Sequence, residues 1–153
     1  MVDLAASIAV LELIGSTVEP CGSRVTCNPP PTDTDLDYLV VVAQHDEAIS
    51  SIVSELSQLG FHWEGSVHYQ TAASDGFMSW RGGDVNFIVT ASAEFARKHR
   101  AATALCTRLN LMNKQDRIAL FQAVLYGNQW DGAGDAPKEP KAAVTVTEEE
   151  ILF

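Results

Sequence analysis

Residues 22–42 read GSRVTCNPPPTDTDLDYLVVV: a small turn, a proline-rich loop, and an acidic pair that opens an apolar run. The turn is Gly22-Ser23, and the acidic pair is Asp35 and Asp37. Residues two apart on a strand point to the same side, so both carboxylates are expected to share one face. Like charges held that close repel each other, and a divalent cation relieves the repulsion. Carboxylate oxygens are ligands that Mg2+ prefers, and Mg2+ commonly brings a phosphate substrate, so the segment predicts a metal-assisted phosphate site.

The bulk composition is that of a globular protein with one core. The chain has 153 residues, of which 46% are hydrophobic and 20% charged, and this length suits a single domain. No apolar run approaches the roughly 20 residues of a membrane span, and Met1-Val2-Asp3 lacks the basic region of a signal peptide. The three cysteines show no CxxC spacing, which argues against a disulfide framework or a zinc site. We therefore expect a cytoplasmic protein with no membrane partner.

The charge balance is acidic. The formal net charge is −10, from 20 acids and 10 bases, which disfavours nonspecific DNA binding because phosphate neutralisation supplies most of that affinity. After Trp130 the composition changes to Gly, Ala, Pro, Lys and Glu. We interpret residues 1–130 as the folded domain and residues 131–153 as an acidic, flexible tail.

Periodicity and turn signals predict the order of elements. Asp3 caps a helix that ends at Gly15, and a second helix runs from about Asp46 to Gly60. Further helices are expected around residues 95–109 and 113–127. Strands are expected at residues 17–20, 37–42, 61–69, 77–81 and 84–90, with a Gly82-Gly83 hairpin turn. This order predicts an α/β fold of the α+β type, a mixed β-sheet flanked by helices.

The Gly-Ser turn, the spacer and the Asp-x-Asp entry into a strand resemble the signature of the nucleotidyltransferase fold, the DNA polymerase beta-like superfamily. The wider string, through residues 86–90 and 116–127, is similar to small nucleotidyltransferase-like proteins predicted in bacteriophages. The resemblance covers roughly residues 4–128. It implies that Gly22, Ser23 and Arg24 contact the triphosphate of a nucleoside triphosphate. It also implies that Asp35 and Asp37 hold Mg2+ (or Mn2+) for an in-line displacement.

The superfamily usually has a third carboxylate on a neighbouring strand, and here the sequence departs from the pattern. The hydrophobic frame of residues 85–89 places that position at Asn86, which brings no charge and cannot act as a base. Asp84 shares its face about 6.5–7 Å away along a strand, and a bulge after Gly83 would bring it closer. Glu64 is another candidate. The departure puts the transfer chemistry, rather than nucleotide and metal binding, in question.

Other features have ordinary structural interpretations. The four histidines show no metal-binding spacing, and no serine or cysteine nucleophile motif is present. Trp80 is expected to pack rather than to stack on a base, and Arg81 to be a surface charge rather than a phosphate contact. Asp35 and Asp37 would be solvated acids of a loop if the Gly-Ser turn did not precede them.

Two functions follow as hypotheses. The first is a Mg2+-dependent nucleotidyltransferase that moves a nucleoside monophosphate onto a hydroxyl of a protein, a tRNA or a small molecule, in the host cytoplasm if the gene is phage-encoded. The alternative is a weak or inactive member of the fold that binds a nucleotide or inhibits a host protein. A weaker third possibility is one half of an antitoxin-like pair.

Overall fold

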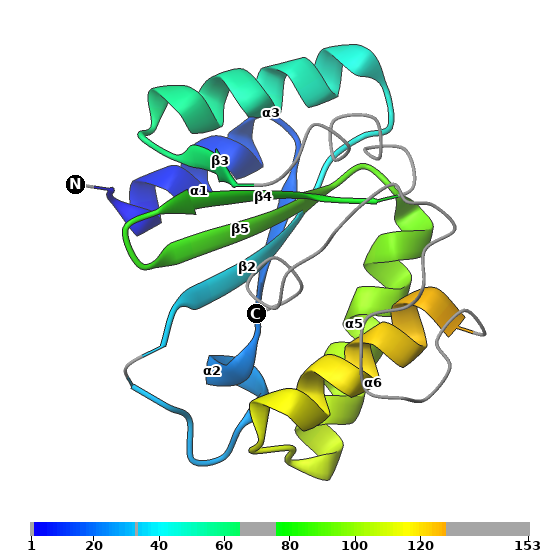
Figure 1. Ribbon diagram of the computed structural model, residues 1–153. Coiled ribbons are helices and arrows are strands. Elements are labelled where there is room, and N and C mark those ends of the chain that lie inside the picture. Colours follow the sequence, from blue (N-terminus) through cyan, green and yellow to red (C-terminus); the bar gives the residue numbers. More distant parts are fainter. Residues whose placement is uncertain (1, 33, 65–75, 128–153) are drawn as a thin grey trace.

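The centre of the fold is a mixed sheet. The structure, a computed structural model, describes residues 2–32, 34–64 and 76–127. Within these residues five strands follow the spatial order β1-β2-β5-β4-β3 (Figure 1). β2 and β5 are parallel, and the other neighbouring pairs are antiparallel. The strands are β1 (Thr17–Cys21), β2 (Leu36–Val41), β3 (His62–Glu64), β4 (Met78–Gly82) and β5 (Val85–Thr90).

Helices flank the sheet. They are α1 (Leu4–Leu13), α2 (Ser23–Thr26), α3 (Asp46–Gln58), α5 (Ala93–Leu109) and α6 (Lys114–Tyr126). The Asp3 side chain accepts from the Ala6 N–H at 3.0 Å, which caps α1, and Asn113 caps α6. The expected mixed sheet flanked by helices is confirmed. The short helix α2 is a difference, because the sequence predicted only a turn there.

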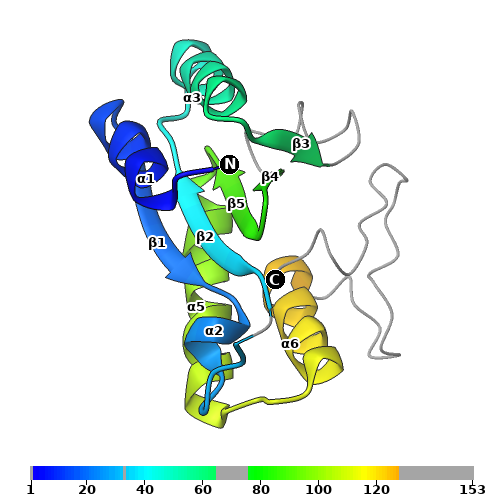
Figure 2. The same cartoon turned by 90° about the vertical axis from the view of Figure 1, so that its left-hand side faces the viewer.

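The helices cover both faces of the sheet. α1 and α3 lie on one side and α5 and α6 on the other (Figures 1 and 2). On the α1 and α3 side, Phe61 stacks on Phe87 with ring centroids 4.8 Å apart, and Trp80 is buried, as its expected packing role requires. On the other side, Arg100 of α5 forms an ion pair with Glu19 of β1 at 2.7 Å.

The β4–β5 hairpin turns one residue later than predicted. Gly82 pairs with Val85, so the turn is Gly83-Asp84 rather than Gly82-Gly83. Gly83 has a φ of +62°, which fits the first position of a type II′ turn. At Gly82, which lies in the strand, a Cβ would lie 2.7 Å from the Val2 side chain, so this position has no room for a larger residue. The register is continuous, so no bulge forms after Gly83.

The prediction for the cysteines is confirmed, and some other predictions lie outside the described residues. The three cysteines are free and buried, as expected of small hydrophobic side chains. No helix in the described ranges is long and apolar enough to cross a membrane. The continuation of the predicted strand through residues 65–69 and the acidic tail at residues 131–153 lie outside the described ranges.

Candidate active site

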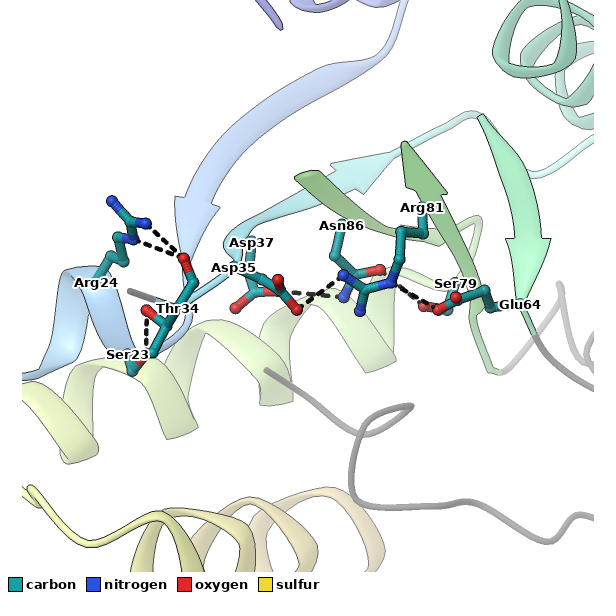
Figure 3. A network of polar contacts seen from close by, with 9 residues as sticks. All are labelled: Ser23, Arg24, Thr34, Asp35, Asp37, Glu64, Ser79, Arg81 and Asn86. Carbon is teal, nitrogen blue, oxygen red and sulfur yellow. Dashed lines mark hydrogen bonds and ion pairs between the residues drawn. The ribbon is translucent and has the colours of Figure 1, made fainter. Parts of the chain in front are cut away.

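A row of polar residues crosses the sheet on the side of α5. Asp37 of β2 is the register partner of Asn86 on β5, and Asn86 is the partner of Arg81 on β4. Register partners project to the same face, as do residues two apart on one strand. Asp35, which precedes β2, therefore belongs to the same row (Figure 3). The predicted place of Asn86 beside the Asp-x-Asp pair is confirmed.

The Gly-Ser turn lies against the second aspartate. Cys21 at the end of β1 is the register partner of Asp37, so the chain enters Gly22 beside this carboxylate. A Cβ added to Gly22 would lie 2.3 Å from Asp37 Oδ2, and the φ of Gly22 is +78°. Only glycine fits both the contact and the backbone conformation. Two motifs that are separated by a loop in the sequence thus meet in one site.

Asp37 is buried, and its environment changes its titration. The residue is 5% exposed, and burial raises its pKa from 3.8 to about 7. The hydrogen bond from Asn86 opposes the shift in pKa, and the neighbouring charge of Asp35 adds to it. Arg81 and Lys114 also lower this pKa by their positive charge. The site thus favours a bound proton, or a bound cation, on Asp37.

Asn86 faces Asp37 with its donor end. Its Nδ2 donates to Asp37 Oδ1 at 3.2 Å, and its Oδ1 accepts from Ser79 Oγ at 2.9 Å. An ionised Asp37 carboxylate can only accept, so it sets the direction of the amide, and the Ser79 hydroxyl donates to the opposite end. The amide oxygen is therefore occupied by Ser79 and directed away from the carboxylate pair. Asn86 acts as a donor to Asp37 rather than as a third oxygen ligand.

Asp35 is neutralised by an arginine that the sequence interpretation treated as a surface charge. Arg81 Nη1 donates to Asp35 Oδ2 at 2.8 Å, and Arg81 Nε donates to Glu64 Oε1 at 3.0 Å. In Figure 3 the guanidinium lies between the two carboxylates. The expectation for Arg81 was wrong. The signal that identifies it is the hairpin register, which places residue 81 opposite residue 86.

The other predicted residues lie around this centre. Ser23 is the first residue of α2, and its Oγ lies 3.5 Å from Thr34 Oγ1. Arg24 Nε donates to the Thr34 carbonyl at 3.1 Å, which ties α2 to the loop before β2. Asp84 is exposed in the hairpin turn, where its carbonyl accepts from the Leu36 N–H at 2.8 Å. The phosphate-binding role of Arg24 and the catalytic role of Asp84 remain predictions.

The donor set fits one divalent cation. Asp35 and Asp37 supply two carboxylates on one face, and Mg2+ is commonly held by one or two carboxylates together with water and substrate phosphates. Within the described ranges, no group of three or more His, Cys, Asp or Glu side chains is placed to hold a metal ion. The remaining ligands of a cation at this pair would therefore come from water and substrate.

The comparisons with known proteins give matches at the level of structure only. No protein-family model and no curated protein matches the sequence. The structure is similar to that of a cytoplasmic RNA terminal U-transferase, with a TM-score of 0.46 and 14% identity over 76% of this chain and 34% of that one. It is also similar to Cid1 in complex with the UTP analogue UMPNPP, with a TM-score of 0.46 and 13% identity over 76% of this chain and 34% of that one. Terminal uridylyl transferase 4 from Trypanosoma brucei with bound UTP and UpU matches with a TM-score of 0.46 and 11% identity, over 78% of this chain and 41% of that one. The chain thus spans about a third to two fifths of the length of these proteins.

Proposed function

We propose that the protein is a Mg2+-dependent nucleotidyltransferase that moves a nucleoside monophosphate from a nucleoside triphosphate onto a hydroxyl group. The observation that carries the proposal is the close approach of Gly22 to Asp37, which brings the Gly-Ser turn, our proposed phosphate cradle, beside the carboxylate pair. The acceptor is a hydroxyl of a protein, an RNA or a small molecule. The sequence resemblance to bacteriophage proteins makes a host protein and a host tRNA the first acceptors to test.

Each residue of the site has a role in this chemistry. Asp35 and Asp37 bind the cation, which when bound supplies positive charge to the triphosphate. In this role the N–H groups of Ser23 and Arg24 and the Ser23 hydroxyl would donate to phosphate oxygens, because the N–H groups of Val25 and Thr26 already donate to the Gly22 carbonyl. The acceptor oxygen then bonds to the α-phosphorus, pyrophosphate leaves, and the hydroxyl proton passes to solvent. Gly22 keeps the turn close to Asp37, so a phosphate bound at the turn would lie beside the carboxylates that would hold the cation.

The test is transfer of label from a nucleoside triphosphate. The protein is incubated with each triphosphate labelled at the α-phosphate, Mg2+ and cell lysate, and compared with Asp35→Asn/Asp37→Asn. The control is Glu12→Gln/Glu47→Gln, which removes the same charge from exposed positions on α1 and α3. Label that depends on Asp35 and Asp37 but not on Glu12 and Glu47 supports the proposal. Equal labelling by all three proteins, or none by the wild type, contradicts it.

A second candidate is a binding protein that retains the fold without turnover. The observation that favours it is Asn86, whose amide supplies neither a third charge nor a free oxygen ligand. Such a protein binds a triphosphate with Mg2+ but transfers nothing, or it captures a host protein. Stoichiometric retention of one host protein by both the wild type and Asp35→Asn/Asp37→Asn, without labelling, would favour this candidate.

A further inference from the structure

Arg81 connects the two outer parts of the polar row. It contacts Asp35, at the entry to β2, and Glu64, on the edge strand β3, through two different nitrogens at 2.8 and 3.0 Å. Its side chain is 23% exposed, whereas those of Asp35 and Glu64 are 47% and 44% exposed. Of the three side chains, that of Arg81 is therefore the least exposed to solvent. A planar guanidinium presents donors in a fixed fork, which suits it to bridging two carboxylates.

The same carboxylate serves the proposed metal. Asp35 Oδ2 accepts from Arg81, yet Asp35 is one of the two acids that hold the cation in the proposed function. A divalent cation at Asp35 and Asp37 and the Arg81 guanidinium are both positive, and both draw on the single negative charge of the Asp35 carboxylate. They repel each other and compete for this one carboxylate.

The neighbouring residue strengthens the competition. Asn86, directly opposite Arg81 in the hairpin, adds no negative charge that could hold a second cation beside the guanidinium. A carboxylate at this position would offer one. The row therefore carries the positive charge of Arg81 at the place where a carboxylate in position 86 would have attracted a second cation.

We propose that Arg81 is a built-in cation that competes with the divalent metal for Asp35 and that metal binding has to displace. This inference rests on the proposed function because it concerns the same metal site. Glu64 holds the arginine in place: when Asp35 binds the metal, Arg81 retains its ion pair with Glu64 and stays beside the site. The affinity for metal is therefore set by an exchange of cations on Asp35.

Binding of Mn2+ alone, measured by the loss of the free Mn2+ signal in electron paramagnetic resonance, tests the inference. Arg81→Gln removes the competitor, so it should bind Mn2+ about tenfold more tightly than the wild type, equivalent to about 1.4 kcal/mol. The matched control is Arg97→Gln, which removes an arginine from the exposed Glu94 ion pair on α5. It makes the same change in net charge and should leave the affinity for Mn2+ within about twofold of wild type, because exposed charges at a distance are screened.

A second variant and a second measurement keep the inference testable if Arg81→Gln folds poorly. Arg81→Lys keeps the charge but not the two-nitrogen fork, so a smaller gain in affinity is expected. Mn2+ should raise the melting temperature of Arg81→Gln more than that of the wild type. Equal affinities in wild type and both Arg81 variants, including no binding in any of them, would overturn the inference. Tighter binding without nucleotide transfer would support the inference while contradicting the proposed function.

Discussion

Replacing Asp37 with asparagine should stabilise the protein at neutral pH. Burial raises the pKa of Asp37 from 3.8 to about 7, so the folded protein keeps a proton that the unfolded chain has released over this range. The folded state binds more protons than the unfolded state, and the free energy of unfolding therefore falls as pH rises from about 4 to about 7. An asparagine side chain at this position carries no charge at any of these pH values, so the variant does not lose this stability.

The magnitude follows from the two pKa values. At 1.36 kcal/mol per pH unit, the rise from 3.8 to about 7 corresponds to roughly 4 kcal/mol. Because Asp37 is 5% exposed, solvent screening reduces this figure little. Asparagine is also able to accept the hydrogen bond from Asn86 Nδ2 through its own oxygen. The advantage of Asp37→Asn should thus be near zero at pH 4 and reach its full value above pH 7.

Urea unfolding of both proteins at several pH values between 4 and 8, without divalent metal, measures this difference. Asp84→Asn, which removes an exposed carboxylate in the hairpin turn, is the control and should give no comparable stabilisation. Adding Mg2+ at pH 7.5 should narrow the gap, because the metal stabilises the ionised aspartate of the wild type. Parallel stability curves, or an asparagine variant that is less stable at pH 8, would refute the reasoning.

Two further substitutions test the packing of the site. Gly22→Ala places a methyl group against Asp37 at a φ of +78°, so it should lower the free energy of unfolding by roughly 2–4 kcal/mol and abolish triphosphate binding. The control is Gly15→Ala, at a φ of +98° with nothing within 4 Å, which measures the backbone strain alone. Equal losses of stability in the two variants would contradict the contact between Gly22 and Asp37. Asn86→Asp replaces a donor to Asp37 with a second carboxylate, so unfolding without metal should become easier by roughly 2–4 kcal/mol. Thermal unfolding with and without Mg2+ should show a larger metal response than in the wild type, and an unchanged response would count against a cation at this row.

The parts of the site close to one strand were predictable from sequence. Asp35 and Asp37 share a face because of the two-residue period of a strand, and the apolar frame of β5 placed Asn86 correctly. Gly22 was predicted to be near them only through the family resemblance. The reason for a glycine there, the approach of Asp37 Oδ2, requires the pairing of β1 with β2.

The position of Arg81 in the site was not predictable from the sequence, because it depends on where the β4–β5 hairpin turns. A turn at Gly82-Gly83 would pair Arg81 with Asp84, whereas the observed turn one residue later shifts the register by two and pairs it with Asn86. Gly82 lies in the strand against the Val2 and Phe61 side chains, which come from distant segments that no local pattern around the turn describes. The burial of Asp37 depends likewise on packing that no local pattern describes.

Calorimetry of ATP, GTP, CTP and UTP binding, with and without Mg2+, is the most direct test of the central claim that Gly22, Ser23, Asp35 and Asp37 form one nucleotide and metal site. The account predicts that at least one triphosphate binds in the presence of Mg2+ and that Asp35→Asn/Asp37→Asn loses this metal-dependent binding. No binding of any triphosphate, or binding that neither Mg2+ nor the double substitution changes, would contradict it.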